Sequence, residues 1–170
     1  MLLDGDDWRA KFRDFRTEAW RLETLPVYRV PQEADEFARF QAGERDFGPR
    51  EDHWIRLVQE RRRTGGSIGR VHIVTRPLTE YLQFEFQRYY SLQAPVGEDI
   101  RILDVTDRDN PLPRVQDFWM FDRSTIVLMH YEDDGTQISR EVYEGDPAPF
   151  VEYQRIALAE SVPFLEYVQG

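Results

Sequence analysis

A strand, a helix and a second strand follow one another within residues 70–105, and this order constrains the fold more than any other feature of the sequence. Arg70–Thr75 is rich in Val and Ile, which favour strands, and Ile100–Val105 has the same character. Between them, Pro77 opens a predicted helix over Leu78–Leu92, which has large apolar side chains on one broad face. Such a β-α-β unit pairs its strands in parallel through a right-handed crossover. The sequence therefore predicts an α/β domain.

Three further strands are predicted after this unit, followed by a closing helix. The strands are Asp117–Asp122, Thr125–Tyr131 and Ile138–Tyr143, and the helix is Pro149–Glu160. Strands that are joined by short turns pair antiparallel, so the sheet should contain both kinds of pairing. We expect a mixed sheet with flanking helices.

The N-terminal part is expected to be mostly helical. Periodicity predicts helices over Asp7–Ala19, Glu33–Ala42 and Glu51–Arg63, and a short strand over Trp20–Leu25. The arginines Arg61–Arg63 precede two glycines, a pattern that is typical of a helix C-terminus rather than of a phosphate site. We expect residues 1–66 to form a helical segment packed on an α/β domain of residues 67–170, the two together making one globular unit.

Charge and cysteine content limit the classes of function. The chain of 170 residues has a net charge of −10, and residues 98–170 contain 16 acidic and 6 basic side chains, which accounts for all of it. An acidic surface repels nucleic-acid phosphates, so direct nucleic-acid binding is not expected, whereas a basic protein partner suits such a surface. The chain has no cysteine, which excludes disulfides and thiolate metal sites.

Neither a membrane span nor a secretory signal is expected. No apolar run approaches the roughly 18 residues that a membrane helix needs. The N-terminus becomes acidic within its first seven residues, unlike a signal peptide. Together with the absence of cysteine, these features indicate a cytoplasmic protein.

The order of the elements over residues 68–166 resembles one half of the phospholipase-D-like fold. The resemblance is sharpest in the β-α-β unit, in Asp117–Met129, where a strand ends in an aspartate before a turn, and in Phe150–Phe164. Active members of that family carry His-x-Lys and, after four intervening residues, an aspartate. The histidine attacks phosphorus and the lysine holds the phosphate oxygens.

This resemblance implies a domain without the catalytic residues. If Asp122 is the aspartate of the motif, the histidine position is Val115 and the lysine position is Asp117. Valine has no lone pair for an attack on phosphorus, and a carboxylate repels phosphate. The resemblance therefore implies a non-catalytic version of the fold, of the kind that binds a ligand or a partner in transcription regulators.

The whole chain also resembles an actinobacterial family known only as domain of unknown function 6879. The segments that carry this resemblance are Phe12–Arg21, Val71–Phe84 and Asp117–Asp122. The resemblance implies no established activity. Members of the family often accompany helix-turn-helix regulators, which implies a regulatory partner.

Five residues are candidates for ligand or partner binding: His72, Arg76, Tyr81, Asp122 and His130. His72 shares a strand face with Val74, and His130 shares one with Ile126 and Leu128, so the two histidines could approach each other across the sheet. Asp104 is the one obvious further ligand, which is too few for a typical zinc site. We therefore expect a hydrogen-bonded histidine in the sheet, and neither a metal nor another cofactor. Asp122 is expected to accept hydrogen bonds from the backbone of the turn at Arg123–Ser124.

The leading functional hypothesis is a non-catalytic regulatory or binding module that acts with a helix-turn-helix transcription regulator. The first alternative is a phosphodiesterase or nuclease, including a toxin, which the fold resemblance and the Arg61–Arg63 triplet favour. The second alternative is a small-ligand sensor. The sequence also leaves a homodimer open.

Overall fold

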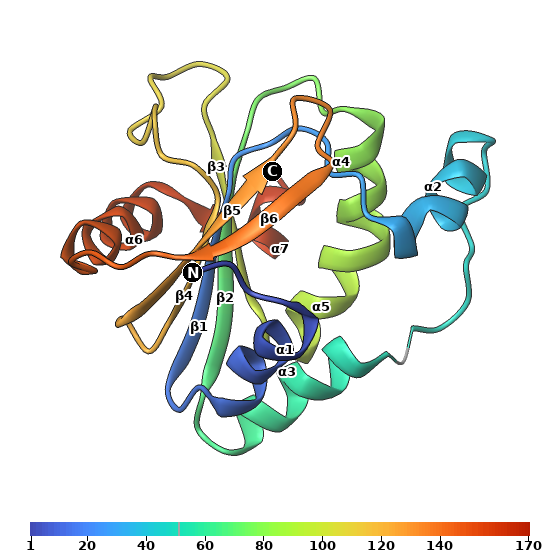
Figure 1. Ribbon diagram of the computed structural model, residues 1–170. Coiled ribbons are helices and arrows are strands. Elements are labelled where there is room, and N and C mark those ends of the chain that lie inside the picture. The colour runs from blue at the N-terminus through green and yellow to red at the C-terminus, as the bar shows by residue number, and fades with distance from the viewer. Residues whose placement is uncertain (51) are drawn as a thin grey trace.

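In the computed structural model, which describes residues 1–50 and 52–170, seven strands form one mixed sheet with helices on both faces (Figure 1). Across the sheet the strands follow the order β6-β5-β4-β1-β2-β3-β7. Their bounds are β1 Glu18–Glu23, β2 Ser67–Val74, β3 Asp99–Asp104, β4 Phe118–Phe121, β5 Thr125–Tyr131, β6 Gln137–Val142 and β7 Val162–Pro163. Strands β1, β2 and β3 run parallel, and every other pairing is antiparallel. The predicted α/β class and mixed sheet are confirmed.

Most of the helices lie close to their predicted positions, and the last one, Phe164–Tyr167, was not predicted. Their bounds are α1 Gly5–Asp14, α2 Ala34–Gln41, α3 His53–Arg63, α4 Glu80–Glu85, α5 Ser91–Val96, α6 Ala148–Glu160 and α7 Phe164–Tyr167. Asp4, Asp52 and Thr79 precede α1, α3 and α4, and each accepts a backbone N–H from the first turn, which stabilises the helix start. The predicted start of the third helix at Glu51 lies outside the described residues. Within the described residues, no helix is long and apolar enough to cross a bilayer.

The first helix is shorter at its C-terminal end than the predicted range Asp7–Ala19. It ends at Asp14, and Phe15 already has an extended backbone. Strand β1 begins at Glu18 and pairs with both β2 and β4, so it lies in the middle of the sheet. A strand from residues 1–66 therefore joins two strands from residues 67–170, although the proposed boundary between these ranges stays a prediction.

The β-α-β unit is confirmed, but its helix is not regular. Strands β2 and β3 pair in parallel, with His72 beside Ile102. The helix predicted over Leu78–Leu92 consists of α4, a π-helical segment over Phe86–Tyr90, and α5 in direct succession. A π-helix forms its hydrogen bonds between residues i and i+5, and such turns are frequent at functional sites.

The two faces of the sheet have different characters. One face packs against α6 (Figure 1), and its core includes Trp20 and Leu22 of β1 and Phe118 of β4. Burying one such large apolar side chain contributes about 1.5–3 kcal/mol. The other face lies under α1, α3, α4 and α5, and receives the alternate residues Arg21 and Glu23 of β1. This second face positions the candidate site.

Candidate functional site

Charged and polar side chains meet on the sheet face beneath α4 and α5, where an apolar core would be expected. We call this group the polar cluster; its members are Arg21, Glu23, Tyr28, Arg70, His72, Glu85, Tyr90, Glu98 and Asp117. All of them are buried except Arg21, whose side chain is 14% exposed. Residues two apart in a strand point to the same face, so β1 contributes Arg21 and Glu23 side by side, and β2 contributes Arg70 and His72.

Arg70 connects two buried carboxylates. Its Nη1 donates to Glu23 Oε1 at 2.8 Å, and its Nε donates to Glu98 Oε2 at 2.6 Å. Glu98 also accepts the indole N–H of Trp54 at 2.7 Å. Burial opposes ionisation of Arg70, but Glu98 and Glu23 outweigh it and raise the Arg70 pKa well above its ordinary value. Because a lone buried charge costs several kcal/mol, these three side chains hold one another in place.

Asp117 is also held from within the chain. Its carboxylate accepts the backbone N–H of Thr24 at 2.9 Å and the Thr24 hydroxyl at 2.6 Å, and it accepts the hydroxyl of Tyr28 as well. Arg21 Nη2 lies 3.6 Å away. Burial raises the pKa of Asp117, and the nearby Arg21 opposes that shift. Val115, two residues earlier, packs against the apolar core beneath α6.

His72 is a fully buried member of the cluster. Its Nε2 is 2.9 Å from the carbonyl oxygen of Leu25, and its Nδ1 is 2.9 Å from the hydroxyl of Tyr90 and 3.3 Å from Glu85 Oε1. Burial alone would lower the pKa of His72, but Glu23 and Glu85 outweigh it and raise the pKa to about 9. The expectation of a hydrogen-bonded sheet histidine is confirmed at His72.

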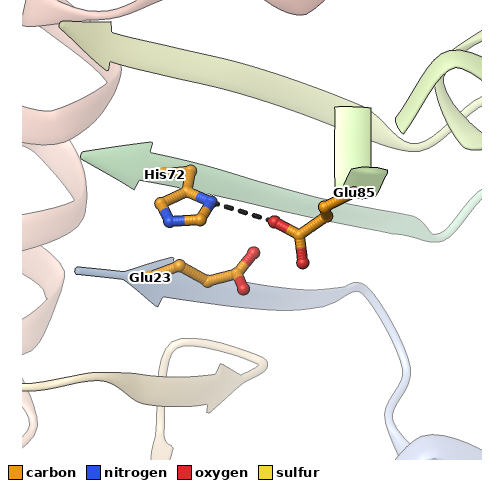
Figure 2. Close-up of side chains that lie close together, drawn as sticks. All are labelled: Glu23, His72 and Glu85. Atoms are coloured by element: carbon orange, nitrogen blue, oxygen red, sulfur yellow. Dashed lines mark ion pairs between the residues drawn. The ribbon is translucent and has the colours of Figure 1, made fainter. Parts of the chain in front are cut away.

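Among the described residues, Glu23, His72 and Glu85 form a group that could hold a metal ion. Figure 2 shows the three side chains converging from β1, β2 and α4. One ligand atom from each lies within 4.8 Å of the other two. One imidazole and two carboxylates form a donor set that suits zinc and its neighbours in the first transition row.

The expected approach of His72 and His130 is wrong. His130 lies on β5, and strands β4 and β1 separate it from β2. Its neighbours Ile126 and Leu128 belong to the core beneath α6, on the face opposite His72. His130 Nε2 contacts Glu141 Oε1 at 3.0 Å instead. The alternation of side chains shows which residues of one strand share a face. It cannot show whether faces of two different strands lie on the same side of the sheet, because the order of the strands was unknown.

Asp104, Arg76 and Tyr81 have partners of their own. Asp104 forms an ion pair with Arg76 at 2.8 Å and accepts the hydroxyl of Tyr167 at 2.7 Å, so it does not join His72. Tyr81 is buried at the margin of the polar cluster, with its hydroxyl 2.8 Å from Glu33 Oε1 and 3.2 Å from Glu85 Oε2. Burial, and then the charge of Glu85, raises the pKa of Glu33 to about 8.

The prediction that Asp122 accepts hydrogen bonds from the turn at Arg123–Ser124 is wrong. It accepts backbone N–H groups from Arg16 at 2.9 Å, Thr17 at 2.7 Å and Glu18 at 3.0 Å. The carboxylate therefore fixes the chain between α1 and β1 to the turn between β4 and β5. Burial opposes ionisation, but these three donors outweigh it and lower the Asp122 pKa to about 2.

Sequence reasoning missed most of the polar cluster. Arg21 and Glu23 alternate with apolar residues, a pattern that normally indicates a solvent-facing side of a strand. Glu85 and Glu98 lie within or just after a helix, where acidic residues are usually exposed. The one available signal was the count of charged residues in β1, which is high for a strand at the centre of a sheet.

Comparisons with known proteins bear on the fold and the family. A family model described as "Domain of unknown function (DUF6879)" matches residues 6–169. No curated protein matches the chain. Among solved structures, Nuc from Salmonella typhimurium, a phospholipase D family member, is similar with a TM-score of 0.51 and 10% sequence identity. The match covers 91% of this chain and 86% of that one, and confirms the phospholipase-D-like fold.

Proposed function

The chain belongs to the DUF6879 family, and from that starting point we propose that it is a non-catalytic regulatory module that binds a helix-turn-helix transcription regulator. The observation that supports the proposal is the environment of Val115 and Asp117, the residues that the register on Asp122 assigns to the histidine and lysine positions of the catalytic motif. Val115 is partly buried and packs against the apolar core beneath α6, and the carboxylate of Asp117 is bonded to Thr24 and Tyr28. Neither residue offers a nucleophile or a cation to a phosphate.

The nearby cations are engaged within the chain. Arg70 is bonded to Glu23 and Glu98, and Arg21 lies beside Asp117 and Glu23 at 3.6 and 3.8 Å. Phosphoryl transfer needs cations that face the substrate and stabilise the charge of its transition state. Guanidinium groups that are committed to buried carboxylates do not fit that role, which supports a non-catalytic module.

Surface shape favours a macromolecular partner over a small ligand. One hollow between α1 and the β4–β5 turn has a volume of about 180 Å³, and another beside Pro26 and Asp133 has a volume of about 220 Å³. Pockets for small molecules typically measure about 300–1,000 Å³. The acidic excess of residues 98–170 complements a basic protein, and DNA-binding regulators are commonly basic.

The test is capture of partners from the native host. The tagged chain, expressed at its natural level, should recover a helix-turn-helix protein by mass spectrometry, and raising the salt concentration should weaken the complex. A charge-reversal variant, Glu132→Lys with Asp133→Lys, changes two exposed acidic residues of the β5–β6 turn and should recover less of the partner. The matched control Glu80→Lys reverses one exposed charge outside the acidic region.

Repeated captures without a DNA-binding protein would refute the proposed partner. Hydrolysis of a phosphodiester substrate by the purified chain, abolished by one substitution, would refute the non-catalytic assignment. Phosphodiesterase and nuclease assays with and without divalent metal therefore accompany the capture experiment.

A further inference from the structure

One carboxylate oxygen in the polar cluster lacks a donor. Glu85 Oε1 is buried and has no hydrogen-bond partner among the described residues, although it lies 3.3 Å from His72 Nδ1. The carbonyl of Leu25 can only accept, so His72 Nε2 carries the proton of that hydrogen bond. In the neutral imidazole, Nδ1 then presents a lone pair to Glu85 Oε1. Two lone pairs that face each other in a buried site need a cation between them. In the metal-free chain that cation is the proton that the raised pKa of His72 retains, and a metal ion that binds between the same two atoms displaces it.

The spacing of these atoms suits a metal ion. Two ligands that bind one zinc at about 2.0–2.1 Å and at the tetrahedral angle are about 3.3 Å apart, which is the separation of His72 Nδ1 and Glu85 Oε1. Glu23 can turn one oxygen toward the ion while Arg70 holds the other. The Tyr90 hydroxyl, 2.9 Å from Nδ1 and 2.7 Å from Glu23 Oε1, is close enough to complete four ligands.

Two of the ligands, His72 and Glu85, are oriented by contacts on the side away from the ion, as metal ligands usually are. His72 donates its second ring N–H to the Leu25 carbonyl, which fixes the tautomer that leaves Nδ1 free to bind. The second oxygen of Glu85 lies 3.2 Å from the hydroxyl of Tyr81. Such outer contacts are as characteristic of a metal site as the ligands are.

The π-helical segment brings two of the ligands to one side. Glu85 and Tyr90 are five residues apart, and in a regular α-helix they would point about 140° away from each other. The Ser91 N–H bonds to the Phe86 carbonyl, five residues back, and this wider turn lets Glu85 and Tyr90 both reach His72. The helix therefore departs from regular geometry at the place where the site needs it.

The charge balance also fits a divalent cation. Once a metal ion has displaced the proton of His72, the imidazole is neutral, and the polar cluster then contains two guanidinium groups, Arg21 and Arg70. They face four carboxylates, which are Glu23, Glu85, Glu98 and Asp117. One divalent ion makes the sum zero, and buried charge is tolerated when it is balanced.

We propose that Glu23, His72 and Glu85, with the Tyr90 hydroxyl as fourth ligand, bind one divalent transition-metal cation, for which zinc fits best. All four ligands are buried side chains, so the site is closed and the ion is structural. It would join β1 and β2 to the helix of the β-α-β unit. This inference is independent of the proposed partner, and its test requires no partner.

The test is metal content after refolding, because a closed site fills as the chain folds. Tag-free protein is refolded with Zn²⁺, dialysed against a weak chelator and analysed by elemental mass spectrometry. We expect one zinc per chain in the wild type, and at least ~100-fold weaker binding in Glu85→Gln. Mg²⁺ in place of Zn²⁺ should not be retained, because Mg²⁺ prefers oxygen ligands and keeps its waters.

The control variant removes the other two histidines together, His53→Gln with His130→Gln, and should retain the zinc. A folded wild type that retains less than ~0.1 zinc per chain would overturn the proposal, as would retention by folded Glu85→Gln or loss from the control variant. If Glu85→Gln does not fold, Co²⁺ replaces Zn²⁺ in the wild type. Visible absorption bands of a four-coordinate nitrogen–oxygen site are then expected, and their absence overturns the proposal.

Discussion

Asp122 should stabilise the fold through its charge, and Asp122→Asn isolates that contribution. The carboxylate accepts three backbone N–H groups from residues 16–18, which lead from α1 into the central strand β1. Asparagine keeps one acceptor oxygen. It also tolerates the left-handed backbone at this position, where φ is +54°, so the substitution adds little strain.

The size of the effect follows from the lowered pKa. The pKa of Asp122 is about 2 in the fold, whereas an unfolded aspartate has a pKa near 3.9. That difference corresponds to ~2.5 kcal/mol of stability at neutral pH. Because Asp122 is partly exposed, water screens part of the interaction, and we expect a loss of ~1–2 kcal/mol in Asp122→Asn.

The pH dependence gives the sign of the effect. The folded pKa lies below the unfolded pKa, so the unfolded chain binds more protons between pH 4 and pH 2. The contribution of Asp122 is therefore complete above about pH 4 and is lost as the pH falls toward 2, with roughly half gone at pH 3.

Urea unfolding of the wild type and Asp122→Asn at pH 7 and pH 3 measures this directly. Asp133→Asn, which neutralises an exposed aspartate in another turn, controls for net charge. The difference in the free energy of unfolding between the wild type and Asp122→Asn should be smaller at pH 3 than at pH 7. Equal stability at pH 7, or a gap of unchanged width at pH 3, would refute the reasoning.

Three further substitutions test the core and the turns. Arg70→Met leaves Glu23 and Glu98 without their shared cation and should lower the free energy of unfolding in urea by ~3–5 kcal/mol, and a loss below ~1 kcal/mol would contradict the burial of these carboxylates. Phe118→Ala empties a fully buried position beneath α6 and should cost ~3–5 kcal/mol, and a loss below ~1 kcal/mol would contradict the packing. In Gly135→Ala, the alanine has to adopt φ of +89°, and its Cβ would overlap the Val27 carbonyl, so calorimetry should show destabilisation by more than ~1 kcal/mol. The comparison variant Gly66→Ala, whose Cβ has no contact shorter than 3.5 Å, should have a smaller effect.

Local sequence patterns predicted most of the elements but not how the sheet is assembled. The Val- and Ile-rich strand at Arg70–Thr75 and the helix after Pro77 were recognisable because each depends on neighbours in the chain. The predicted first helix extended beyond Asp14, because the end of α1 depends on a contact with Asp122, which lies more than 100 residues later in the chain. A single-sequence pattern contains no information about such a contact.

The candidate site was even less accessible to sequence reasoning. His72 was selected from its strand, but Glu23 and Glu85 become its neighbours only when β1 pairs with β2 and the π-helical segment turns toward the sheet. The possible approach of His72 to His130 was wrong, because side-chain alternation describes one strand at a time. It does not show which faces of two strands share a side of the sheet before the strand order is known.

The sequence by itself determined the α/β class, the β-α-β unit and the antiparallel strands after it, because periodicity is a local property. It also shows valine at position 115 and aspartate at position 117, where the resemblance to the phospholipase-D-like family assigns histidine and lysine. Only the tertiary structure decided that β1 lies at the centre of the sheet, that Glu23 is buried and that Arg21 is largely covered. A charged residue is stable in the interior only beside its partners, and those partners come from distant parts of the chain.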